Sequence, residues 1–115
     1  MIFHTKIYKL YSQKIIMDID YLKSWSEQIG RIDHEILFLL KRRFQILKKV
    51  AKYIKDNDLE FDNQIVKDEI LKRVVSKGIS MGMNEKFIRE VFNEILKEDE
   101  KKQKIFLEEY ESKNK

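Results

Sequence analysis

The sequence predicts an all-α fold of three helices, of which the first is by far the longest. The 115 residues include no proline and only three glycines, and they are 43% hydrophobic and 38% charged. Long helices joined by few turns have this composition. Apolar residues also recur at intervals of three and four, which places them on one face of a helix.

The first helix is predicted from about Asp18 to Lys55. Short polar side chains at residues 56–58 then favour a turn over a helix interior. One cation, Arg43, occupies a seam position where the other members are apolar. Those members are Leu22, Trp25, Ile29, Ile32, Ile36, Leu39, Ile46, Val50 and Tyr53.

The length of this helix predicts a second chain. At 1.5 Å per residue it spans more than about 50 Å, which exceeds the width of a globule of this size. Part of the apolar seam therefore needs a returning helix or another copy of the chain to cover it. We expect a homodimer.

Two shorter helices are predicted after the turn. Asp62 can cap the second helix, Gly78 is expected to end it, and residues 78–83 form the connection. The third helix is predicted to begin at Asn84 and to run towards Glu111. Its inward stripe is interrupted by two polar residues, and it comprises Ile88, Phe92, Ile95, Asp99, Gln103, Phe106 and Tyr110.

Composition excludes several classes of function. The chain has no cysteine and only two histidines, so we expect no metal site and no nucleophile paired with a base. It also has no glycine-rich phosphate loop, and we expect no cofactor. The net charge is +4, but lysine and glutamate alternate, which argues against nucleic-acid binding. No apolar run is long enough to span a membrane. We therefore expect a cytoplasmic protein without a membrane or nucleic-acid partner.

Arg43 is the residue that most constrains function. An unpaired charge in a core costs several kcal/mol, so a buried guanidinium requires either an acidic residue or a bound anion. Asp99 on the third helix could supply the first. A bound acidic ligand could supply the second.

The residues around Arg43 resemble the all-helical, type II class of chorismate mutases. The resemblance covers roughly residues 20–105. It rests on the runs Ile29-x-x-Ile32-Asp33-x-x-Ile36-Leu37-x-Leu39-Leu40-x-x-Arg43, Val50-Ala51-x-Tyr53, Gly82-Met83-Asn84 and Phe87-Ile88-x-x-Val91-Phe92-x-x-Ile95, followed by Gln103. It implies an intertwined homodimer in which the long helix crosses both halves.

The resemblance also sets the expected domain boundaries. We expect a chorismate-mutase-like helical domain over residues 18–115, preceded by a basic extension over residues 1–17 whose order the sequence does not decide. Met17 is a candidate native start.

The resemblance also implies a reaction, the pericyclic conversion of chorismate to prephenate in aromatic amino acid biosynthesis. Cations hold the substrate carboxylates, and differential stabilisation of the transition state is the mechanism. By the same resemblance, Arg43 is a carboxylate-binding residue. Gln103 stands beside the ether oxygen of the substrate, and Asp62 is the acidic residue at the start of the second helix.

Five other positions depart from the family pattern. Expected cations align with Ser26, Ile54 and Ile65, an expected glutamate with Val66, and an expected serine with Asp99. A π-bulge near Ile54 would turn the adjacent lysine inward instead. We expect this degenerate site to make catalysis weak or absent, because each lost charge-assisted hydrogen bond costs roughly 1.5 to 3 kcal/mol.

Three functions are compatible with the sequence. The first is a chorismate mutase of weak or lost activity. The second is a non-catalytic helical homodimer that acts as an interaction or structural protein. The third is an enzyme similar to isochorismate pyruvate lyases, which are related helical proteins acting on a related dicarboxylate.

Overall fold

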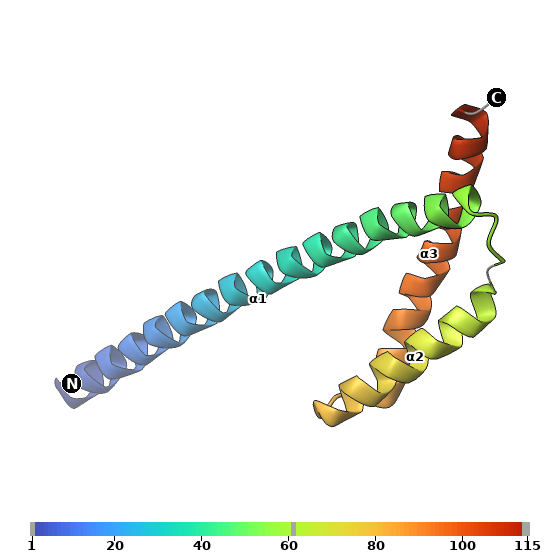
Figure 1. Ribbon diagram of the computed structural model, residues 1–115. Helices are drawn as coiled ribbons and strands as arrows, with labels where there is room; N and C mark the ends of the chain where they lie inside the picture. Colours follow the sequence, from blue (N-terminus) through green and yellow to red (C-terminus); the bar gives the residue numbers. More distant parts are fainter. Residues whose placement is uncertain (1, 61, 114–115) are drawn as a thin grey trace. The chain divides into compact units, whose positions relative to one another are not determined.

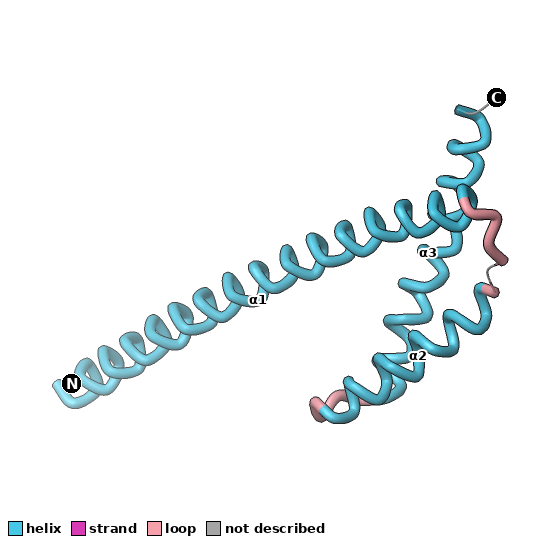
Figure 2. Tube along the Cα trace, viewed as in Figure 1, coloured by secondary structure: helices cyan, strands magenta, loops and turns pink. Residues whose placement is uncertain are grey.

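The computed structural model of the protein is built from helices alone over the residues that it describes. These are residues 2–60 and 62–113 for the backbone, and 18–60 and 62–112 for the side chains. The helices are α1 (Ile2–Asp56), α2 (Asn63–Ser80) and α3 (Glu85–Lys113), joined by two short connections (Figures 1 and 2). The predicted all-α, three-helix architecture is confirmed.

Helix α1 begins earlier than the sequence indicated. It was expected from about Asp18, but the helical backbone extends to Ile2. Residues 2–17 contain neither proline nor glycine, so no residue in that stretch interrupts the backbone hydrogen bonds. The side chains of residues 1–17 lie outside the described residues, and the basic extension stays a prediction.

The chain divides into two compact units, Met1–Lys41 and Arg42–Lys115. This division lies elsewhere than the predicted boundary at residue 17. That boundary separates a basic extension from the helical domain, and the division into compact units does not test it. The first unit consists of α1 alone. Its apolar seam is open, with Leu22, Ile29 and Leu39 each about 60% exposed. The Trp25 ring stacks on Tyr21, with 5.6 Å between the ring centroids.

In the second unit, the closest approach of helix backbones is between α2 and α3, and Gly78 makes it possible. Gly78 was expected to end α2, but it lies inside the helix and is buried. A Cβ at this position would lie 2.2 Å from Cδ1 and 3.0 Å from Cγ1 of Ile88, itself only 4% exposed. Glycine is therefore required here by close packing between helices, which outweighs its low helix propensity.

The turns that end and begin these helices follow their local sequence. Asp62 caps α2 as predicted, because its carboxylate accepts hydrogen bonds from the backbone N–H groups of Gln64 (2.9 Å) and Ile65 (3.2 Å). Asn84 does the same for α3 by accepting from the N–H of Phe87. Gly82 has φ of 78°, the left-handed conformation that favours glycine, so it makes the turn predicted at Gly78.

Within the second unit, the last turns of α1 bury a face that differs from the predicted seam. Phe44, Leu47 and Ile54 are partly buried and Ala51 is 3% exposed, whereas seam residues such as Ile46 and Tyr53 are more than half exposed. Successive helix residues are about 100° apart, so the two sets occupy neighbouring faces. The face that α1 uses within the unit therefore overlaps the predicted seam only in part, at Arg43 and Val50.

Replacing Gly78 by alanine should destabilise the protein despite the better helix propensity of alanine. The new Cβ forces the buried Ile88 out of its position, at a cost of about 1–3 kcal/mol that exceeds the gain of about 1 kcal/mol in propensity. Gly30→Ala is the matched control, since nothing lies within 4 Å of the added Cβ there. Denaturant unfolding should show a loss for Gly78→Ala and no loss for Gly30→Ala. Equal midpoints for the two variants would contradict the close-packing role.

Candidate functional site

Within the second unit, the last turns of α1 line a half-open cavity of about 200 Å³ together with α2 and α3. Each helix contributes residues spaced three and four apart, so each presents one face. The cavity is mostly apolar, with a small set of charged and amide groups. It is lined by Arg43, Leu47 and Val50 of α1, by Asn63, Val66, Lys67 and Ile70 of α2, and by Leu96, Asp99, Glu100 and Gln103 of α3.

Arg43 reaches this cavity from α1 and is paired there with an acid of its own chain. Its guanidinium Nη1 donates to Oδ2 of Asp99 on α3, as the sequence allowed. Asp99 is buried, with 6% of its surface exposed, whereas 31% of the Arg43 side chain is exposed. The guanidinium therefore keeps contact with solvent while the carboxylate does not.

The second carboxylate oxygen of Asp99 is not satisfied within the protein. Oδ1 is buried and no described group of the protein donates a hydrogen bond to it. A buried charged acceptor without a donor costs a few kcal/mol, which Arg43 offsets in part through the other oxygen. Loss of the ion pair should therefore cost more for Asp99, which is buried, than for Arg43, which can contact solvent.

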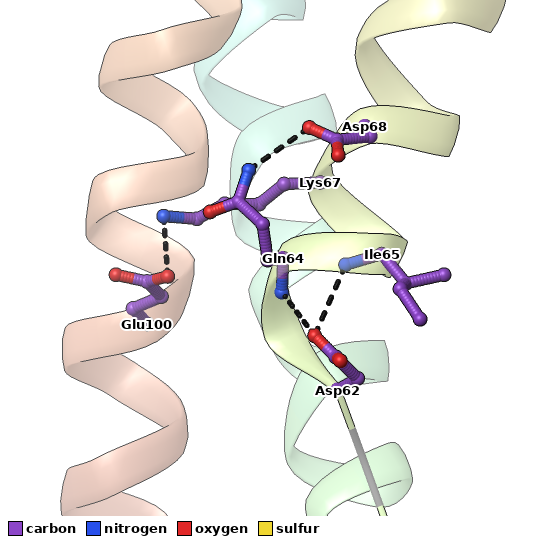
Figure 3. Close-up of polar contacts among 6 residues, drawn as sticks. All are labelled: Asp62, Gln64, Ile65, Lys67, Asp68 and Glu100. Carbon is purple, nitrogen blue, oxygen red and sulfur yellow. Dashed lines mark hydrogen bonds and ion pairs between the residues drawn. The ribbon is translucent and has the colours of Figure 1, made fainter.

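A second ion pair lies at the same cavity, and the sequence analysis missed it. Lys67 extends from α2 to Glu100 on α3 (Figure 3), and both residues line the cavity. The Lys67 side chain is 26% exposed and that of Glu100 is 41% exposed. The signal was available, because Asn63, Val66, Lys67 and Ile70 have the spacing of one helix face.

Two of the positions carried over from the family line the Arg43 cavity alongside Arg43 and Asp99. Gln103 follows Asp99 by one turn of α3, and Val66 lines the cavity from α2. Ile54 lines a neighbouring hollow that also includes Gln103. The structure therefore brings together Arg43, Val66, Asp99 and Gln103, with Ile54 beside them.

Lys55 does not turn towards this site. Helix α1 is regularly α-helical through Asp56, without the π-bulge that would rotate Lys55 inward. Instead, Nζ of Lys55 donates to Oε1 of Glu111 at 2.7 Å. That hydrogen bond, together with the charge of Glu111, raises the pKa of Lys55 above its ordinary value.

Three predicted positions lie elsewhere. Asp62 is exposed and acts as the cap of α2 (Figure 3). It lines a shallow acidic hollow and not the Arg43 cavity. Ile65 is 62% exposed and faces away from the cavity. Ser26 belongs to the first unit, where its side chain is exposed.

The arrangement is suited to holding a small polar molecule by charge, without covalent chemistry. No group of three or more potential metal ligands occurs within the described part of the chain. Over the same residues, no helix combines the length and the apolar character needed to cross a bilayer. What the cavity offers is two cations, two carboxylates and two amides against an apolar wall.

The two halves of the Arg43–Asp99 pair should differ in their effect on stability. Arg43→Met leaves a buried carboxylate without a partner, and we expect it to lower the free energy of unfolding by about 2–3 kcal/mol. Asp99→Asn leaves a guanidinium that can reach water, and we expect a loss below about 1 kcal/mol. Urea unfolding at pH 7 measures both, and a larger loss for Asp99→Asn would contradict the asymmetry.

A family comparison agrees with this geometry. A sequence model described as chorismate mutase type II matches residues 25–104, which is more than half of the chain. No curated protein and no solved structure matches the chain significantly. The matched range includes Arg43, Lys67, Asp99 and Gln103 and ends just after the last of them. The chain therefore belongs to the chorismate mutase type II family.

Proposed function

We propose that this family member has a cavity neutralised by its own carboxylates, so that conversion of chorismate to prephenate is weak or lost. The observation that supports this is the Arg43–Asp99 ion pair. The family reaction uses cations to hold two substrate carboxylates. Here the arginine that would do so is already held by a buried acid.

The charge balance of the cavity supports the same proposal. Its two cations, Arg43 and Lys67, are each paired with an acid of α3, so the four charges sum to zero. A dianion must displace these acids and leave one of them buried without its partner. Losing two or three charge-assisted hydrogen bonds, each worth roughly 1.5 to 3 kcal/mol, lowers a rate by several orders of magnitude.

The lining of the cavity and of the adjoining hollow points in the same direction. Ile54 and Val66, where the family pattern has a cation and a glutamate, add apolar surface in place of hydrogen-bonding groups. A polar substrate would therefore bind with fewer directional contacts.

The apolar seam of α1 supports a second function, that of a helical homodimer acting through its surface. Ile32, Ile36 and Leu39 are each between 49% and 60% exposed in the chain. Contiguous apolar patches of this kind on soluble proteins mark interaction sites. We propose that the seam of a second copy covers this one, whether or not the cavity retains catalysis.

The proposed loss of activity can be measured by following chorismate absorbance. Wild-type protein should convert chorismate little faster than the uncatalysed reaction. Asp99→Ser removes the competing acid, and it should raise the rate at least about tenfold, corresponding to about 1.4 kcal/mol. The gain should vanish in the double variant Asp99→Ser with Arg43→Met, which keeps the serine but removes the cation. Efficient turnover by the wild-type protein would contradict the proposal.

The proposed homodimer can be tested by light scattering coupled to size-exclusion chromatography. The wild-type protein should have twice the chain mass of 14.1 kDa. Ile36→Asp places a charge on the seam and should shift the population towards monomer, because an unpaired charge in an apolar interface is costly. His34→Asp, at an exposed position outside the seam, is the matched control. A monomeric wild-type protein at micromolar concentration would rule the dimer out.

A further inference from the structure

The cavity next to Arg43 contains a second cation that the family pattern does not assign. Lys67 lies on the face of α2 that lines the cavity, and only 26% of its side chain is exposed. Lys72 and Lys77, on the same helix, are exposed and do not line it. The position of Lys67 therefore distinguishes it from the other lysines of α2.

The two ion pairs at the cavity differ in how easily they open. Asp99 is almost fully buried, so it cannot exchange Arg43 for water. Glu100 is 41% exposed, and such partly solvated pairs contribute little to stability. Glu100 can turn to solvent at little cost and release the Lys67 ammonium towards the cavity.

The position of Lys67 also compensates for what the cavity lacks. The expected cations of the family align with Ile54 and Ile65, and neither position supplies charge to the Arg43 cavity. A lysine is a mobile point charge on a flexible stem, so it can follow a carboxylate within the cavity. Arg43 and Lys67 approach the cavity from different helices, which suits a ligand with two separated anionic groups.

We infer that Lys67 is a specificity-determining residue of this cavity and that it binds one carboxylate of a dicarboxylate ligand in exchange for Glu100. This inference rests on the proposed function, since it concerns the same site. In this arrangement, Arg43 binds the other carboxylate through guanidinium N–H groups other than the Nη1 donor that Asp99 holds. Glu100 acts as a competitor at the rim. Lys67 thereby sets the preference for two carboxylates over one.

The test is isothermal titration calorimetry with chorismate, and with benzoate as a probe that has a single carboxylate. Wild-type protein and the Asp99→Ser variant are the two backgrounds. In each background, Lys67→Met should weaken chorismate binding about tenfold or more, since a charge-assisted hydrogen bond is lost. Benzoate affinity should change by less than about twofold in the same variant, because Arg43 alone can hold its single carboxylate.

Three further variants control this experiment. Glu100→Gln removes the competitor and should tighten chorismate binding several-fold. Lys67→Arg keeps the charge and should retain most of the affinity. Lys72→Met removes an exposed lysine of the same helix and should leave both affinities unchanged.

The outcomes separate this inference from the proposed function. Equal weakening of both probes by Lys67→Met, or no weakening of either, would overturn the inference and leave the proposed loss of catalysis intact. Efficient wild-type turnover combined with a selective loss of chorismate binding would overturn the proposed function and support the inference. Failure of chorismate to bind any variant, including Asp99→Ser, would overturn the inference.

Discussion

The ion pair between Arg43 and Asp99 is the interaction on which the site depends. It joins α1 to α3 within the second unit, where close backbone approach is confined to α2 and α3. Other contacts between α1 and α3 are also made by long side chains, including Lys48 over the ring of Phe106 and Lys102 over the ring of Phe44. Arg43 and Asp99 both line the cavity. The charge that holds the helices together is thus the charge that a ligand would need.

The sequence predicted the parts of the structure that local chemistry determines. The caps at Asp62 and Asn84 follow from side chains that compete for backbone N–H groups. The caps need only the residue and its neighbours in the helix. For Arg43, the cost of burying an isolated charge predicted an anionic partner but left open an acidic residue or a bound ligand, and the structure places Asp99 there.

The features that the sequence analysis missed depend on which helices meet. Helix propensity predicts that Gly78 ends α2, but Gly78 lies inside the helix because Ile88 of α3 packs against it. Lys67 was passed over because the family pattern pointed to Ile65 and Val66, whereas the cavity face of α2 includes Val66 and Lys67. Periodicity alone cannot tell which of two neighbouring faces is covered, since they differ by a single residue step.

The contact between Gly78 and Ile88 also constrains how this sequence can vary. Any side chain at position 78 occupies space that Ile88 now fills, so a larger residue there is compatible only with a smaller one at position 88. The two substitutions would then have non-additive effects, each harmful alone and less harmful together. Related sequences that keep this helix crossing should therefore change at the two positions in concert, and such paired changes would identify the crossing from sequence alone.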